Sequence, residues 1–247
     1  MFKSLAARAP SRFHWGMEDI ASLWPLYGLR LRSESIEMRY PTESDLAALA
    51  ELALDDIHDP ATMPFSEPWT DQPPEQRARS VLQWNWRMRG AWAPESWHLA
   101  LVAVRDGRVV GTQGMLAKSF AVTRAVETGS WVGRRYQGGG IGTVMRRALL
   151  HLAFAGLGAE LARSGAFTDN ATSLRVSEKL GYAPDGTETL ERRGEQATIK
   201  RLVLPRSRWE EMSRTWPPVA LEGLEPALGL FGLPTEPSTS DPSKGSG

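Results

Sequence analysis

A glycine-rich turn at residues 137–143, with the sequence Gln-Gly-Gly-Gly-Ile-Gly-Thr, has the residue types best suited to chemistry. A strand pattern precedes this turn and a helix pattern follows it. Several main-chain amides at the helix N-terminus would therefore point in one direction, where the helix dipole adds positive potential. Such a turn can hold a pyrophosphate without a lysine. The alternative is a turn that needs glycine only for its positive φ angles.

This turn does not match two common nucleotide-binding glycine motifs. A P-loop requires Gly-Lys-Ser/Thr, which is absent here, and a Rossmann turn requires a third glycine at an offset that the chain lacks. Glu160 does lie about twenty residues further on, where a dinucleotide fold places its ribose-binding acid. One acid does not replace the missing glycine, so a nucleotide-binding oxidoreductase is only a distant alternative.

The elements that must position this turn follow from the hydrophobic periodicity and the turn signals. Thr42, with Asp45 at the capping-box position, begins the first helix, and Pro73-Pro74 opens the second. The expected strands are an edge strand at 36–40, a hairpin at 97–105 and 108–112 around Asp106-Gly107, strands at 125–132 and 160–166, and a closing hairpin at 187–193 and 198–204. Helices are expected after the glycine turn and over 172–180. This order predicts a mixed α/β sheet in one layer with helices packed on it.

Composition excludes several classes of function. The chain has 247 residues, with 29 Lys and Arg against 29 Asp and Glu, no cysteine, and four histidines without metal-ligand spacing. Balanced charge argues against nucleic-acid and membrane partners, and the lack of cysteine excludes disulfides and thiolate metal sites. We therefore expect a cytoplasmic protein without a metal. Residues 1–22 are expected to be a flexible leader, 23–216 one folded domain, and 217–247 a disordered tail rich in Pro, Ser and Gly.

Two motifs at the right separation resemble the GNAT superfamily of acyl-CoA-dependent N-acyltransferases. Gln137-x-x-Gly140-x-Gly142 after a strand resembles its Arg/Gln-x-x-Gly-x-Gly/Ala signature. Residues 170–182 resemble the Asn-x-x-Ser and Glu-Lys-Leu-Gly-aromatic block of its RimJ/RimL branch. The resemblance implies a mostly antiparallel twisted sheet that is splayed at the acyl-CoA site, with helices on both faces. It also implies transfer of an acetyl or succinyl group from coenzyme A to a primary amine of a protein N-terminus or a small molecule, without a metal.

The resemblance assigns roles to individual residues. Main-chain amides would hold the CoA pyrophosphate, and those residues are Gln137, Gly138, Gly139, Gly140, Ile141, Gly142 and Thr143. The strand ending at Trp131 and Val132 would pair with the pantetheine arm, and an amide there would polarise the thioester carbonyl. Asn170 would bind the arm and Ser173 would protonate the departing thiolate. The alternative for Asn170 is a helix cap without a chemical role. In many GNAT enzymes a tyrosine that acts as the general acid occupies the position of Ser177 in this chain.

The reaction needs a neutral amine, and therefore a base. Glu127 and His58 are the candidates, although His58 could instead be a structural loop histidine bonded to Asp59. Phe65 and Trp69, in a proline-rich loop, are expected to line an acceptor pocket. Five tryptophans occur in this half of the chain, at 69, 84, 86, 92 and 97. They fit a core, an acceptor slot or a homodimer surface. The competing function is a catalytically weak acyl-CoA sensor or scaffold.

Overall fold

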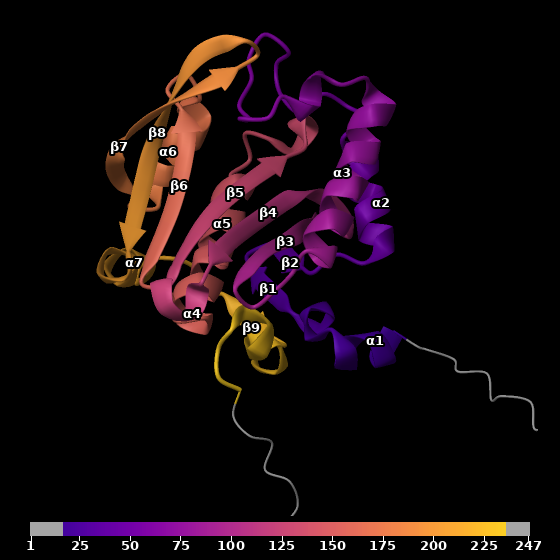
Figure 1. The fold of residues 1–247 in the computed structure, drawn as a ribbon, viewed down its shortest axis with the longest axis vertical. Coiled ribbons are helices and arrows are strands. Elements are labelled where there is room, and N and C mark those ends of the chain that lie inside the picture. Colours follow the sequence, from indigo (N-terminus) through magenta and orange to yellow (C-terminus); the bar gives the residue numbers. More distant parts are fainter. Residues whose placement is uncertain (1–16, 236–247) are drawn as a thin grey trace, which may run out of the picture.

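A computed structural model describes residues 17–235 of the chain. Its centre is one nine-stranded sheet in the order β7-β8-β6-β5-β4-β3-β2-β1-β9 (Figure 1). The strands are β1 (Arg30–Ser33), β2 (Ile36–Arg39), β3 (Ser96–Arg105), β4 (Arg108–Lys118), β5 (Ala125–Val132), β6 (Leu161–Phe167), β7 (Ala183–Arg192), β8 (Glu195–Pro205) and β9 (Ala220–Glu222). The helices are α1 (Met17–Leu23), α2 (Glu43–Leu52), α3 (Pro74–Gly90), α4 (Phe120–Thr123), α5 (Ile141–His151), α6 (Ala171–Lys179) and α7 (Arg206–Ser213). The mixed, mostly antiparallel α/β sheet expected from the sequence is confirmed.

All strand pairs are antiparallel except β5 and β6. These two strands pair only at residues 125–127 with 161–163. Beyond this point β5 continues to pair with β4 as far as Val132, while β6 pairs with β8 as far as Phe167. The two strands therefore diverge, as Figure 1 shows. This divergence is the splay that the family resemblance implied.

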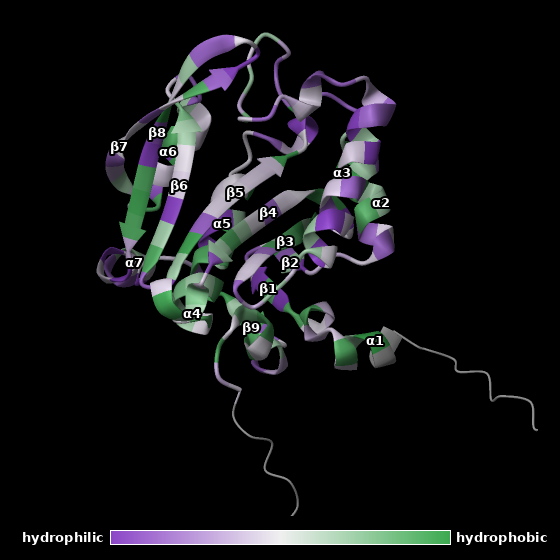
Figure 2. Cartoon of the chain, in the orientation of Figure 1, coloured by the Kyte–Doolittle hydropathy of each residue, from purple (hydrophilic) through white to green (hydrophobic). Residues whose placement is uncertain are grey.

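Helices cover both faces of the sheet with separate apolar clusters. On one face α5 buries Met145 and Leu149 against Leu99 and Leu101 of β3. On the other face α2 and α3 pack on the alternate residues of β3 (Val102 and Val104). Figure 2 shows apolar residues along the central strands and polar residues on the outer side of α3. Because side chains alternate along a strand, residues of β5 also divide between an α5 face and an α2/α3 face.

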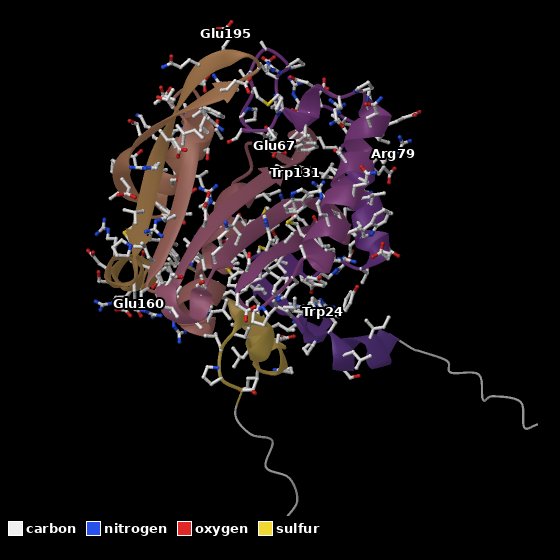
Figure 3. The ribbon with its side chains drawn as sticks, in the orientation of Figure 1. Trp24, Glu67, Arg79, Trp131, Glu160 and Glu195 are labelled. Atoms are coloured by element: carbon white, nitrogen blue, oxygen red, sulfur yellow. The ribbon has the colours of Figure 1, made fainter. Side chains whose placement is uncertain are left out.

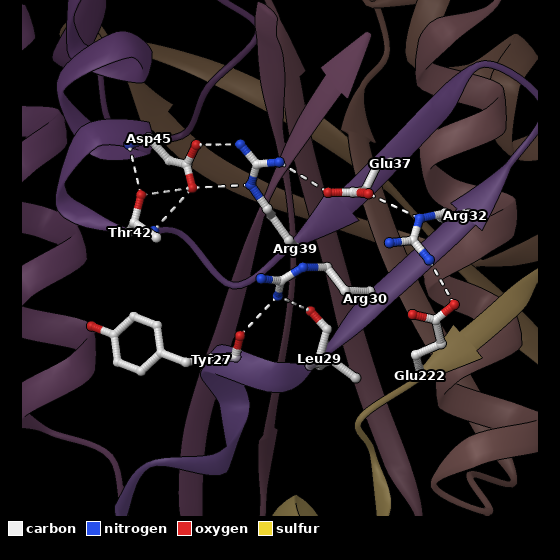
Figure 4. Close-up of polar contacts among 9 residues, drawn as sticks. All are labelled: Tyr27, Leu29, Arg30, Arg32, Glu37, Arg39, Thr42, Asp45 and Glu222. Carbon is white, nitrogen blue, oxygen red and sulfur yellow. Dashed lines mark hydrogen bonds and ion pairs between the residues drawn. The ribbon is translucent and has the colours of Figure 1, made fainter. Parts of the chain in front are cut away.

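A polar network fixes the start of α2 against strand β2. Thr42 accepts a hydrogen bond from the Asp45 amide, and the Asp45 carboxylate accepts one from the Thr42 amide, forming the expected capping box. Arg39 donates to both carboxylate oxygens of Asp45, at 3.1 and 2.7 Å (Figure 4). Burial raises the pKa of Asp45, but the hydrogen bonds from Arg39 and Thr42 outweigh it and hold this pKa below the usual value.

Three expectations about the edge of the sheet and the two ends of the folded domain are wrong. The 36–40 strand is not at the sheet edge, because β1 and β9 lie outside it. The leader expected at 1–22 contains helix α1 from residue 17, while residues 1–16 lie outside the described part. The tail expected at 217–247 is ordered through residue 235, because β9 pairs with β1 and Phe231 is fully buried against Trp92 and Trp97. Residues 236–247 also lie outside the described part.

Within residues 17–235, no helix combines the length and the apolar character needed to cross a membrane.

Candidate active site

The glycine turn opens helix α5 with amides that face outward. Gly138 and Gly140 have φ of 81° and 79°, so the turn uses the left-handed conformation that glycine adopts without strain. The Gln137 and Thr143 amides donate to Arg134 and Gly140 carbonyls. In the described part of the chain, the amides of residues 138–142 have no protein acceptor. These five amides, and not the full set from Gln137 to Thr143, are free for an anion.

The side chain of Gln137 ties this turn to its surroundings. Its Nε2 donates to the carbonyls of Ile57 and Val132, at 2.7 and 2.8 Å. Gln137 thus holds the turn against the end of β5 and the loop after α2, and its side chain is occupied. Two arginines precede the turn: Arg135 pairs with Asp55 at 3.3 Å, and Arg134 is exposed. Their charges increase the positive potential around the free amides.

The second half of β5 offers main-chain groups along the open side of the sheet. The Gly133 amide donates to the Val110 carbonyl on β4. Main-chain groups alternate in direction along a strand, so the Trp131 amide also faces β4, whereas the Val132 amide faces the side from which β6 has diverged. The structure thereby separates the two amides that the sequence left as alternatives, because only that of Val132 points into the divergence.

An aromatic row leads from β5 to the loop between α2 and α3. Trp131 lies 5.8 Å from Trp69, Trp69 lies 5.3 Å from Phe65, and Phe65 lies 5.8 Å from His58, measured between ring centroids. Figure 3 shows Trp131 on β5, on the side of this loop. The structure therefore brings together the two expected acceptor residues and the end of β5.

His58 is held by its own loop. Its Nδ1 contacts the Asp59 carbonyl at 2.8 Å and its Nε2 contacts the Thr70 hydroxyl at 2.7 Å. Both ring nitrogens are thus engaged, which favours the structural alternative over a role as base. His58 also lines a cavity of about 240 Å³ with Thr70, Asp71, Arg77 and Arg193.

Glu127 lies on the same face of β5 as Trp131, because the two are four residues apart along the strand. It is exposed, and its carboxylate has no hydrogen bond or ion pair among residues 17–235. Between them Gly129 stands beside Gly114 of β4. A side chain at Gly129 would meet no atom within 4 Å. Gly129 thus leaves open space over the main chain between Glu127 and Trp131, whereas a side chain at Gly114 would meet the ring of His98.

Asn170 caps helix α6. Its Oδ1 accepts a hydrogen bond from the Ser173 amide at 3.1 Å. The expected capping alternative is therefore realised, while the Asn170 amide nitrogen has no partner in the part of the chain that the structure describes. The Ser173 hydroxyl is likewise free within these residues, and its carbonyl accepts from Ser177 at 3.1 Å. Both side chains retain a group that can bind a ligand.

Sequence reasoning missed Arg146, which lies on α5 and is 5% exposed. Its guanidinium donates to the Ser177 hydroxyl at 2.9 Å and contacts the Ser130 hydroxyl at 3.5 Å. Its Nε has no partner. Nearby, the Tyr182 hydroxyl contacts Thr128 at 3.3 Å. A charged residue within the apolar pattern of α5 was the one signal that could have indicated this cluster.

A family model described as acetyltransferase (GNAT) domain matches residues 35–183. The chain belongs to the GNAT acetyltransferase family. Its fold is also that of several solved structures. RimJ of Mycobacterium smegmatis, solved with CoA-disulfide, is 20% identical with a TM-score of 0.62, covering 83% of this chain and 95% of that one.

RimL, described as a ribosomal L7/L12 alpha-N-protein acetyltransferase and solved with coenzyme A, is 18% identical with a TM-score of 0.56; the match covers 70% of this chain and 95% of RimL. The ribosomal-protein-S5-alanine acetyltransferase of Vibrio fischeri is 18% identical with a TM-score of 0.58. The match covers 73% of this chain and 98% of that one. At these identities the likeness concerns the fold, and it agrees with the RimJ/RimL-like motifs of the sequence.

In this GNAT acetyltransferase the loop between α2 and α3 is joined to the β7–β8 hairpin. Arg193 pairs with Asp71 and donates to the Pro60 carbonyl. Arg192 pairs with Asp169 and donates to the Met63 carbonyl at 3.0 Å. The hairpin and the loop that carries Phe65 and Trp69 therefore meet on one side of the diverging strands.

Proposed function

We propose that this protein transfers an acetyl group from acetyl-CoA to a primary amine by direct attack of the amine on the thioester. The observation that carries the proposal is that the five free amides of residues 138–142 follow the end of β5, whose second half pairs with β4 and no longer with β6. A pyrophosphate on these amides directs the rest of CoA along the unpaired side of β5. Succinyl-CoA is the second donor to be compared.

The residues present fit this donor. The pantetheine arm extends along Gly129, Ser130, Trp131 and Val132 as an added strand, and the amide nitrogen of Asn170 donates to it. The Val132 amide donates to the thioester carbonyl, where negative charge develops during attack. Such a donor typically contributes about 3 to 4 kcal/mol of transition-state stabilisation.

The amine enters on the face of β5 that carries Glu127 and Trp131. Glu127 accepts the proton of the attacking amine directly or through water, because its carboxylate is unpaired and beside open space. Phe65 and Trp69 line the acceptor side. A protein α-amino group is our preferred acceptor, since RimL is named as an alpha-N-protein acetyltransferase and the Vibrio fischeri enzyme is named for an alanine of a ribosomal protein. A small-molecule amine is the alternative.

The decisive experiment compares Gly139→Asp with Gly139→Asn. A side chain at Gly139 would meet no atom within 4 Å, and Gly139 lacks a positive φ, so both variants should fold. The carboxylate repels the pyrophosphate, whereas the asparagine has the same shape without the charge. We expect titration calorimetry to show at least a tenfold weaker affinity for CoA in Gly139→Asp than in Gly139→Asn.

Equal affinity of the two variants would contradict the proposed pyrophosphate site. A second measurement addresses the sensor alternative, which is favoured by the structural roles of His58 and Asn170. Wild-type protein mixed with acetyl-CoA and peptides with free N-termini should release CoA thiol at a rate proportional to protein concentration. Tight CoA binding without thiol release would identify a binding module.

A further inference from the structure

Arg146 is a buried cation without a carboxylate. The residue is 5% exposed, and its only side-chain partners among residues 17–235 are the hydroxyls of Ser177 and Ser130. Burial lowers the pKa of its guanidinium, while the nearby Tyr182 has the opposite effect. An arginine in a protein nevertheless keeps its proton. Removing this charge from water costs several kcal/mol, and neutral hydroxyls offset only part of that cost. The fold therefore holds a cation ready for an anion.

The position of Arg146 indicates where that anion binds. Ser130 belongs to the part of β5 that no longer pairs with β6, and Ser177 belongs to α6 on the other side of the divergence. The guanidinium therefore links the two elements that border the opening. Thr128 closes the base of this opening by donating to the Arg163 carbonyl of β6 at 3.2 Å.

The groups proposed above do not supply an acid for the leaving thiolate. An alcohol is a weaker acid than a thiol, so the Ser173 hydroxyl can donate a hydrogen bond to sulfur but cannot give up its proton to it. Burial raises the pKa of Tyr182, and its hydroxyl is engaged with Thr128. At Ser177, where many relatives have an acidic tyrosine, the hydroxyl donates to the Ser173 carbonyl and accepts from Arg146.

We propose that Arg146 is the counter-charge of the departing CoA thiolate, so that the sulfur leaves as an anion instead of being protonated. The amine nitrogen forms a bond to the thioester carbon, and the carbon–sulfur bond breaks with its electron pair going to sulfur. The proton lost by the nitrogen goes to Glu127 and then to water. The thiolate takes up a proton from solvent after CoA leaves. This inference rests on the proposed placement of CoA along β5.

Other charges near the opening do not replace Arg146. Glu127 and Arg163 are neighbours in the β5–β6 register and lie on the opposite face of the sheet from Ser130. Tyr182 is the titratable group that shares the α5 face with Arg146, and it is neutral at pH 7 because burial raises its pKa. Of Arg146 and Arg163, Arg146 is the one on the α5 face of the opening, and an adjacent arginine lowers the pKa of a thiol.

The test measures the ionisation of CoA bound to the wild-type protein. The ultraviolet absorbance of the thiolate, followed against pH with CoA saturated by protein, gives the pKa of the bound thiol. Free CoA titrated in the same buffer gives the reference value, and we expect the thiol of bound CoA to ionise at least one pH unit lower than that, because an adjacent arginine lowers the pKa of a thiol. If calorimetry shows that CoA does not bind, the proposed function fails. If CoA binds and its thiol ionises at or above the pKa of free CoA, this inference is overturned while the proposed function stands.

Variants then assign the effect to Arg146. In Arg146→Gln the pKa of the bound thiol should return to that of free CoA. Arg146→Lys retains the charge and should keep at least half of the shift, which also covers the case in which Arg146→Gln fails to fold. Arg147→Gln is the matched control, because Arg147 is the next residue of α5 and pairs with Glu34. An unchanged shift in Arg146→Gln would overturn the assignment, and the free amides of α5 would then be its source.

Discussion

Arg39 and Arg146 belong to two regions that treat a buried or half-buried guanidinium in opposite ways. Arg39, on β2, donates to both oxygens of Asp45 and pairs with Glu37, so its guanidinium has two carboxylates beside it (Figure 4). Arg146, on α5, is more deeply buried and contacts two serine hydroxyls. Carboxylates of the protein neutralise the charge of Arg39, whereas no carboxylate among the described residues neutralises the charge of Arg146.

This difference separates a structural role from a functional one. A cation that is matched by carboxylates holds elements together, and here it fastens the start of α2 to the sheet. A cation that is buried without a carboxylate lowers the stability of the empty protein and becomes favourable only when an anion arrives. Proteins tolerate such costs at functional sites, where residues often depart from the usual preferences for packing and for paired polar groups.

The largest expected effect is the difference in the free energy of unfolding between Arg39→Met and Arg146→Met. Arg39→Met leaves the Asp45 carboxylate, which is 7% exposed, without its cation, and should lower the free energy of unfolding by roughly 3 kcal/mol. Arg146→Met replaces a buried charge with an apolar side chain of similar length, so stability should be unchanged or higher. Urea unfolding of both variants measures the two free energies.

The same comparison has a clear contrary outcome. If Arg146→Met lost as much stability as Arg39→Met, the serine hydroxyls would be compensating the charge fully. The structural argument for a missing anion would then fail.

A smaller effect concerns His98, a buried base that can avoid its charge by losing a proton. Burial lowers the pKa of His98 to about 4, whereas an unfolded histidine titrates near 6.5. The folded state therefore binds fewer protons between these values. The resulting stability is complete above pH 6.5 and decreases as pH falls toward 4, by up to about 1.4 kcal/mol per pH unit.

Urea unfolding at several pH values between 6.5 and 4.5 measures this decrease. His98→Gln should show a flatter dependence over the same interval. Asp45 contributes little there, because its lowered folded-state pKa and the pKa of about 3.9 of an unfolded aspartate both lie below the interval. Burial also lowers the pKa of His151, and this contribution remains in both proteins. An equally steep dependence in His98→Gln would show that other groups cause it.

The smallest expected effect is that of Ser130→Ala. The contact between Ser130 and Arg146 is 3.5 Å long, at the limit of a hydrogen bond, so its loss should change stability by no more than about 0.5 kcal/mol. If the charge of Arg146 sets the ionisation, the pKa of the thiol of bound CoA should stay within about 0.3 units of the wild-type value. A return to the free-thiol value would show that Ser130, and not Arg146, sets the ionisation.

The sequence predicted those features that depend on residues close together in the chain. The capping box of Thr42 and Asp45 spans one helical turn, and the Asp106-Gly107 hairpin lies between two adjacent strands. The glycine turn and the helix after it are also contiguous. Each of these signals is strong because its partners are fixed by local geometry.

Features built from distant residues could not be predicted in this way. Arg146 meets Ser177 and Ser130 only after α5, α6 and β5 have packed, so its sequence neighbours do not reveal its lack of a carboxylate. Nor did the sequence indicate that His58 would meet Thr70, or that Trp92 and Trp97 would pack on Phe231. The Pro, Ser and Gly content of the C-terminal segment resembled that of a disordered tail, although Ala227, Phe231 and Leu233 of this segment belong to the hydrophobic core.

The pairing of β9 with β1 sets an order of events during synthesis. Arg32 of β1 forms an ion pair with Glu222 of β9, although 190 residues separate them. The ribosome has already released the glycine turn and the diverging strands by the time residue 222 emerges. Contacts between such distant segments form slowly, since a long loop must close first. Until then β1 presents an unpaired strand edge and Trp97 lacks its cover of Phe231, so the nascent chain is most prone to association with other chains just before its last described segment docks.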